Sequence, residues 1–237
     1  MNPVNVVRWG GIALVGGAIA FLAVFSYLAA TFNYPDVLDG PAATVLPSLL
    51  RTGSSGRAAW TIYAFLPLIW IPAGVGAFEA LSPVRRGAMR LAMLFALVAA
   101  LAMMLGLMRW PSIHWSLAQA FVQAAPAEQA VIAATFDGLN TYLGNFIGEF
   151  LGEIAFSIFF LLTSFAWLRS PGRARWIGWL GVATGAAGIL GAFRNITSVV
   201  APLAAVNNYL LPLFMIILGI GLIRCRPSEL RDTAPIS

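Results

Sequence analysis

Long apolar runs alternate with short polar stretches along the whole of this chain. A helix needs about 20 apolar residues to cross the hydrocarbon core of a bilayer, and six of the runs are long enough. We therefore expect an all-α, polytopic transmembrane bundle with six spans. The predicted spans cover about residues 6–32, 58–81, 90–109, 142–168, 174–193 and 203–224.

Two long connections interrupt this pattern, and each contains a predicted surface helix. The first, residues 33–57, is rich in Pro, Gly and Ser, and its segment Ala42–Leu50 is apolar enough to lie on the membrane surface. In the second, residues 111–141, Pro126 followed by Glu128 indicates a helix start, because proline and an acid are both favoured in a first turn. We expect one bundle over residues 1–226 and a polar cytoplasmic tail over residues 227–237.

The arginines predict the orientation of the bundle. Loops on the cytoplasmic side of a membrane protein carry an excess of positive charge. Ten arginines fall at one set of span ends and four at the other, so both termini are expected in the cytoplasm and the two long connections outside. The ten are Arg8, Arg85, Arg86, Arg90, Arg169, Arg173, Arg175, Arg224, Arg226 and Arg231; the four are Arg51, Arg57, Arg109 and Arg194.

Composition supports this class and excludes several others. Of the 237 residues, 60% are hydrophobic and 10% are charged, whereas a soluble domain carries about a quarter charged residues. The basic residues are all arginines near span ends, which argues against a nucleic-acid surface. A single cysteine, Cys225, excludes an internal disulfide, and a single histidine, His114, excludes bis-histidine haem ligation and a multi-histidine metal site. We expect no cofactor and no metal.

The fourth predicted span contains the candidate chemistry. Residues four apart lie on one face of a helix, and this span repeats small and polar residues at that spacing. A smooth groove is formed by Gly144, Gly148 and Gly152, and a polar ridge by Asn145, Glu149, Glu153 and Ser157. Two carboxylates inside a membrane helix need partners, water or a proton, because an unpaired charge in hydrocarbon costs at least about 2.5 kcal/mol.

Counting residues from the cytoplasmic end of each span predicts which groups share a level. Glu149, Arg194 and Arg109 fall near the outer edge of the hydrocarbon, while Glu153 lies one turn deeper, level with the amides of Asn207 and Asn208. We therefore expect Glu149 to be ionised and paired with Arg194, Arg109 or both. Two nearby carboxylates repel, so Glu153 is the better candidate for a protonated or switchable acid.

A structural interpretation of the same residues has equal standing. Glutamates and arginines at one level can form a buried ion-pair network that fixes the register of helices without binding any substrate. His114 lies in an aromatic stretch and is expected to be a solvated interfacial residue, with a proton acceptor for the outer pocket as the alternative. The expected interfacial tryptophans are Trp9, Trp167, Trp176 and Trp179 inside and Trp60, Trp110 and Trp115 outside, while Trp70 is expected in the core.

Five short motifs stand out along the chain: Phe32–Asp36, Tyr142–Gly144, Gly148–Gly152, Trp176–Gly181 and Asn208–Pro212. Through these motifs the chain resembles a family of uncharacterised bacterial six-pass integral membrane proteins, a domain of unknown function. The resemblance implies a helical bundle in the bacterial inner membrane and no activity, and Glu153 lies outside the resembling motifs.

Three functions remain open. The first is a protein whose outward-facing polar pocket, built from Glu149, Glu153, Arg194 and Arg109, binds or conducts a small solute, with proton coupling included. The second is a non-catalytic subunit or sensor whose ion pairs are structural. The third is a membrane enzyme that uses a glutamic acid as general acid on a lipid or isoprenoid; we favour the first two. The bilayer, a solute or lipid ligand and a second copy docked through glycine-lined helices are the expected partners.

Overall fold

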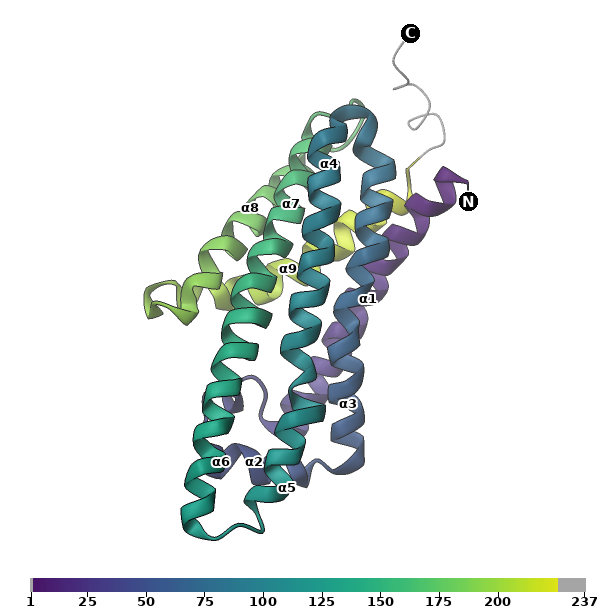
Figure 1. The fold of residues 1–237 in the computed structure, drawn as a ribbon. Coiled ribbons are helices and arrows are strands. Elements are labelled where there is room, and N and C mark those ends of the chain that lie inside the picture. The colour runs from purple at the N-terminus through teal and green to yellow at the C-terminus, as the bar shows by residue number, and fades with distance from the viewer. Residues whose placement is uncertain (1, 226–237) are drawn as a thin grey trace. The chain divides into compact units, whose positions relative to one another are not determined.

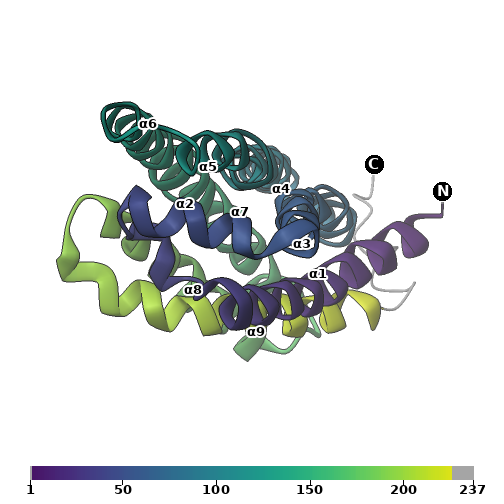
Figure 2. The same ribbon diagram turned by 90° about the horizontal axis from the view of Figure 1, so that it is seen from below.

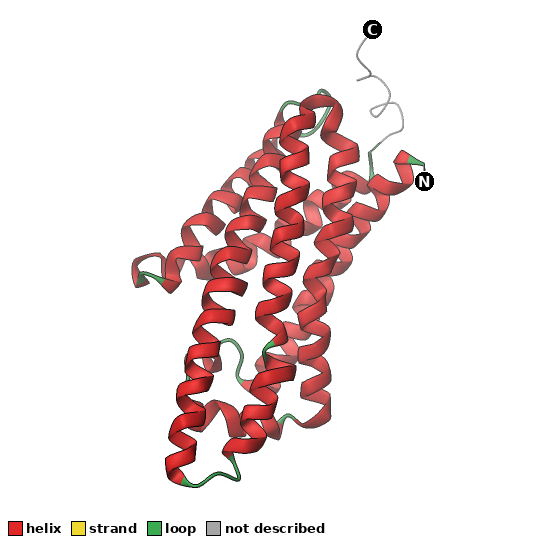
Figure 3. Cartoon of the chain, in the orientation of Figure 1, coloured by secondary structure: helices red, strands yellow, loops and turns green. Residues whose placement is uncertain are grey.

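The computed structural model describes residues 2–225, and every regular element in this range is a helix (Figure 3). Two of the elements, η3 and η4, are π-helices, and the other η elements are 3-10 helices. In chain order the elements are α1 (Pro3–Phe32), η1 (Asp36–Asp39), α2 (Ala42–Arg51), α3 (Gly53–Phe65), η2 (Leu66–Ile69), α4 (Trp70–Met108), η3 (Trp110–His114), α5 (Trp115–Phe121), α6 (Pro126–Leu139), η4 (Asn140–Leu151), α7 (Gly152–Leu168), α8 (Arg175–Ala192), η5 (Phe193–Asn195), η6 (Ser198–Val200) and α9 (Ala201–Ile223).

Five continuous helical segments in the described range are long and apolar enough to cross a membrane: residues 3–32, 53–121, 126–168, 175–195 and 198–223. The second segment doubles back, because the backbone leaves the helical region at Arg85, with φ −150° and ψ 68°. A methyl group built on Gly74 would lie 3.0 Å from Cβ of Ala96, so the two parts of α4 pack side by side (Figure 1). Residues 2–225 thus contain five or six long apolar helices, depending on whether α4 counts once or twice, as a multi-pass membrane protein requires.

Local sequence signals account for several boundaries. Pro67 interrupts the second apolar run, because the chain tightens there into the 3-10 turn η2. The predicted helix start at Pro126 is confirmed, and the carboxylate of Glu128 accepts a hydrogen bond from the backbone N–H of Ala125 at 3.2 Å. The predicted short helix in the first connection is α2. The predicted polar tail, residues 227–237, lies outside the described residues.

The described chain falls into two compact units. Unit 1 comprises residues 2–19, 67–101 and 150–225. Its centre is a row of phenylalanines on α7, where Phe156 stacks on Trp70 with ring centroids 4.0 Å apart and Phe160 meets the edge of Phe214 of α9. Trp70 is therefore a core residue, as predicted. Glycine contacts bring α1 close to its neighbours: a methyl group on Gly10 would lie 2.7 Å from Cα of Gly76 of α4.

Unit 2 comprises residues 20–66 and 102–149, and its core is aromatic. Trp60 and Trp110 stack with centroids 4.9 Å apart, and Phe32 meets the edges of both rings. The short helix α2 covers one end of this core and packs against α5 and α6 (Figure 2). The predicted outer tryptophan belt is therefore wrong for Trp60, Trp110 and Trp115, which are buried. Of the inner set, Trp9, Trp176 and Trp179 are exposed and Trp167 is buried.

Candidate functional site

A two-point ion pair joins α7 to the turn that follows α8 in unit 1. Nη1 of Arg194 lies 2.6 Å from Oε2 of Glu153, and Nη2 lies 2.7 Å from Oε1. Two parallel, charge-assisted hydrogen bonds are the strongest and most directional arrangement that a guanidinium and a carboxylate can form. The side chains of Arg194 and Glu153 keep 26% and 22% exposure, so the pair is accessible from outside the unit.

Glycines explain how three helices approach closely enough to form this site. The glycines of α8 face α7 and α9: a methyl group on Gly191 would lie 3.0 Å from Cα of Ala204, and one on Gly188 would overlap Oγ of Ser157 and lie 3.1 Å from Nδ2 of Asn207. Larger residues at these positions would push the helices apart. The close packing thus brings Ser157, one helical turn along α7 from Glu153, near Asn207 of α9. These glycines pack against helices of the same unit. Docking of a second copy of the chain on glycine-lined helices stays a prediction.

Asn207 adds a buried polar group to this site. Its side chain is 7% exposed, and Oδ1 has no hydrogen-bond partner among the described residues. A buried amide oxygen without a donor is costly, so such an atom is normally found with water, a ligand or a neighbouring hydroxyl. Its sequence neighbour Asn208 is exposed, and the level predicted for it stays a prediction.

A second polar cluster lies in unit 2 around Arg109, whose side chain is buried. Nε donates to Oδ1 of Asn140 at 3.1 Å, and Nη1 donates to the carbonyl of Gly106 at 2.6 Å. The guanidinium lies against Gly144, where any side chain would collide with it. The amide of Asn140 also donates to the carbonyl of Leu38 at 3.0 Å, so this one side chain links α4, η4 and the first connection.

The structure brings together only part of the predicted constellation. Arg194 pairs with Glu153, the carboxylate that was predicted to lie beside amides as a protonated or switchable acid. The chain leaves the α-helix after Ala192 for the 3-10 turn η5, and the side chain of Arg194 also donates to the carbonyl of Gly191 at 3.3 Å. Glu149 is half-buried and belongs to unit 2 with Arg109, and its expected ion pairs stay a prediction.

The prediction of a solvated His114 is wrong. The residue is 0% exposed and lies between Trp110 and Phe136, with ring centroids 4.8 and 4.6 Å away. Both ring nitrogens lack a hydrogen-bond partner among the described residues. The π-turn η3, in which the backbone N–H of His114 donates to the carbonyl of Arg109, turns the imidazole into the aromatic core.

Sequence reasoning missed Asn140 and the polar residues around it. A signal was available, because Asp137 and Thr141 continue the four-residue spacing of Asn145 and Glu149 toward the N-terminus. No group of three His, Cys, Asp or Glu side chains that could hold a metal ion is found within the described part of the chain.

Comparison with known proteins adds one finding. A family model described as a domain of unknown function (DUF4386) matches residues 10–223, from within α1 to the end of α9. The expected resemblance to an uncharacterised family is thereby confirmed. No curated protein and no solved structure matches the chain.

Proposed function

We propose, from the premise that this chain belongs to the family of a domain of unknown function (DUF4386), that it is a six-pass protein of the bacterial inner membrane that binds a small solute. The reversal at Arg85 supports six spans, because it divides the longest apolar segment into two. The distribution of arginines supports cytoplasmic termini and an outward-facing Glu153–Arg194 pair.

The observation that carries the proposal is a partly exposed ion pair about one helical turn from a buried amide whose oxygen has no donor among the described residues. A guanidinium fork is suited to carboxylate and phosphate groups, and here Glu153 occupies it. A solute that carries such a group can take the place of Glu153, and Oδ1 of Asn207 offers an acceptor to a hydroxyl or amine of the same solute.

This exchange links solute binding to a proton. When Glu153 is ionised it competes with an anionic solute for Arg194, and when it is protonated it loses most of its attraction to the guanidinium. Protonation of Glu153 therefore favours the form in which Arg194 binds the solute. The expected mechanism is uptake of one anionic group together with one proton on the outward side.

A second candidate has one observation in its favour. Both Nη atoms of Arg194 donate to the two carboxylate oxygens of Glu153, as expected if the pair only holds α7 against the end of α8. In that case the chain is a non-catalytic membrane subunit or sensor, and removing one partner destabilises it because the other is left uncompensated.

Two variants separate these functions. Glu153→Gln removes the competing charge with little change of shape, and Arg194→Gln removes the fork. With the purified protein in lipid nanodiscs, we would measure saturable binding of succinate and of inorganic phosphate at about pH 5 and about pH 8. The proposal expects Glu153→Gln, which lacks the competing charge, to bind both probes more tightly than the wild type at the same pH, and Arg194→Gln to bind neither probe.

The control is Glu128→Gln, which neutralises an exposed acid at the start of α6. If neither probe binds to the wild-type protein, and mass spectrometry of the purified protein finds no co-purified anion, the solute proposal is wrong. A large loss of thermal stability in Glu153→Gln and Arg194→Gln, without any effect on binding, identifies the pair as structural.

A further inference from the structure

Two turns of unit 1 lie beside each other, and both are rich in arginine. One is the reversal of α4, and the other joins the end of α7 to the start of α8. Nη2 of Arg173, in the second turn, donates at 3.3 Å to the carbonyl of Ala80, which lies shortly before the first turn, and both turns are drawn at the top of Figure 1. The arginines of the two turns are Arg85, Arg86, Arg90, Arg169, Arg173 and Arg175.

The start of α1 and the end of α9 bring two more arginines to the same end of the unit. A methyl group on Gly11 of α1 would lie 3.0 Å from the backbone nitrogen of Ile223, the last residue of α9. Arg173 also reaches this place, since its Nη2 lies 3.3 Å from Sγ of Cys225. We call these two arginines and the six of the turns the basic end; the two are Arg8 and Arg224.

The positive charge of the basic end is not balanced within the described part of unit 1. This part contains nine arginines and two acids, Glu79 and Glu153, and Glu153 is paired with Arg194. Seven arginines of the basic end are exposed, and they make no ion pair and no side-chain hydrogen bond with a described residue. The eighth, Arg173, holds the two turns together.

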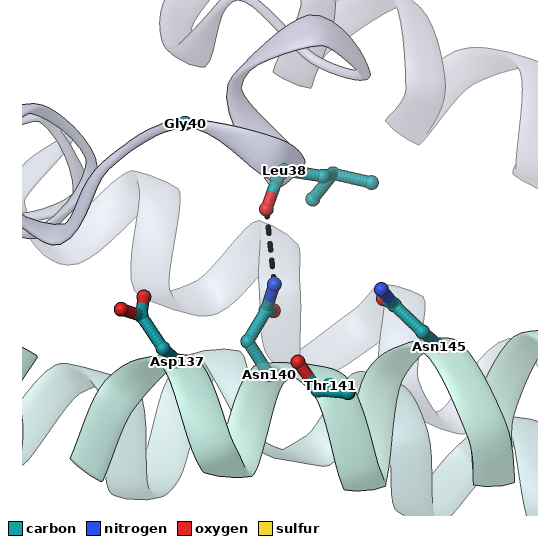
Figure 4. A pocket seen from close by; sticks show the side chains of 6 residues that line it. All are labelled: Leu38, Gly40, Asp137, Asn140, Thr141 and Asn145. Carbon is teal, nitrogen blue, oxygen red and sulfur yellow. Dashed lines mark hydrogen bonds between the residues drawn. The ribbon is translucent and has the colours of Figure 1, made fainter. Parts of the chain in front are cut away.

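The four arginines at the other set of span ends are used inside the protein. Nε of Arg109 donates to Asn140, whose own amide donates to the carbonyl of Leu38 (Figure 4). The other three also donate to groups of the described chain; they are Arg51, Arg57 and Arg194. Guanidinium groups without a partner among residues 2–225 are therefore concentrated at the basic end, where they can bind anions from outside the protein.

Exposed apolar side chains border the basic end. In three helices, an exposed arginine is followed at once by a large apolar residue that is more than half exposed; these residues are Trp9, Leu91 and Trp176. From there α1, α4 and α8 continue as long apolar helices. Tryptophan is enriched at the level of the lipid headgroups. An anion that meets both the arginines and this apolar border is better matched by a phospholipid than by a free phosphate.

We propose that the basic end binds the headgroups of anionic phospholipids in the adjoining leaflet of the membrane. The phosphates lie against the exposed guanidinium groups, and the acyl chains lie beside the apolar border. The inference rests on the part of the proposed function that places the chain in a membrane, and it does not depend on the Glu153–Arg194 site.

The test uses the exposed tryptophans as reporters. Within residues 2–225, Trp9, Trp176 and Trp179 are exposed and the other five tryptophans are buried, so quenching by bromine on a lipid reports on the basic end. The full chain would be reconstituted in vesicles of phosphatidylglycerol and phosphatidylcholine in equal amounts. Bromine near the headgroup end of the acyl chains is carried by phosphatidylglycerol in one set and by phosphatidylcholine in the other.

The wild-type protein is expected to be quenched more strongly by the brominated phosphatidylglycerol. The expected preference is about fivefold or more, because a single arginine near an anionic surface contributes about that factor. Arg86→Gln and Arg175→Gln, combined in one variant, should lower the preference by about fivefold or more. The control Arg51→Gln removes an exposed arginine of unit 2 and should leave the preference unchanged. Arg194→Gln should also leave it unchanged, which separates this surface from the proposed solute site.

Three outcomes would overturn the proposal: equal quenching by the two brominated lipids, an unchanged preference in the combined variant, or loss of the preference when inorganic phosphate replaces chloride at equal ionic strength. The last would show that the surface takes a free phosphate. Quenching by neither lipid would refute the membrane location itself, and this inference with it. If the combined variant does not fold, salt decides the matter: at about 1 M salt the Debye length falls to about 3 Å, so a preference that salt leaves unchanged would also refute the proposal.

Discussion

Gly106→Ala tests whether close contact between helix backbones holds unit 2 together. A methyl group on Gly106 would lie 2.5 Å from Cα of Gly148 and 2.9 Å from the carbonyl oxygen of Leu143. Both atoms belong to the backbone of η4, so no side chain can rotate away to make room. The substitution must separate the end of α4 from η4.

The expected loss of stability follows from two opposing effects. Overpacking of this kind costs about 1–3 kcal/mol, and contact with two backbone atoms favours the upper end of that range. Replacing glycine by alanine inside a helix returns about 1 kcal/mol. The net destabilisation is therefore about 2 kcal/mol, which corresponds to a melting temperature about 4–8 °C below that of the wild type for a chain of this size.

The matched control is Gly138→Ala on α6, where an added methyl group meets no atom within 4 Å. That variant gains helix propensity without a clash and is expected to melt at or slightly above the wild-type temperature. Melting would be followed by tryptophan fluorescence and by size-exclusion chromatography of heated, detergent-solubilised protein. If Gly106→Ala melts as high as Gly138→Ala, the backbone contact does not hold the unit together.

Two further substitutions test the interior of unit 2. Asn140→Ala removes the hydrogen bonds that Asn140 makes to Nε of Arg109 and to the carbonyl of Leu38. Losing each bond leaves a group unsatisfied, which costs about 1–3 kcal/mol of folding stability, so the melting temperature of this variant should fall clearly. An unchanged melting temperature would show that water replaces the amide. His114→Phe removes two ring nitrogens that have no hydrogen-bond partner among the described residues, and it keeps an aromatic ring between Trp110 and Phe136. Its melting temperature should therefore equal or exceed that of the wild type. A fall of several degrees would mean that a buried water or ligand binds the imidazole.

The sequence predicted the elements well because their signals are local. Apolar run length predicted the long helices but not all of their bounds, since the predicted span 142–168 is the second part of a continuous helix over residues 126–168. Pro126 and Glu128 marked the start of α6. These features depend on the bilayer thickness, on capping and on the missing N–H of proline, and each can be evaluated from a few neighbouring residues.

The rotation of side chains about the helices could not be predicted in the same way. Counting residues assumed straight α-helices, but the chain is a π-helix from Asn140 to Leu151 and at Trp110–His114, and a 3-10 turn at Arg194. Each change alters the number of residues per turn. These changes occur where the prediction and the structure differ: at Arg194, which pairs with Glu153, at His114, which lies in the aromatic core, and at Asn140, which binds Arg109.

The glycines of α8 reverse the usual relation between side-chain size and importance. On this helix the large residues Trp176, Trp179 and Leu190 are more than half exposed, while Gly181, Gly185 and Gly188 face neighbouring helices at distances that leave no room for a methyl group. Bulky positions on α8 should therefore accept many apolar replacements, and its smallest positions should accept almost none. In a mutational scan of α8, substitutions of these glycines should be the least tolerated on the helix.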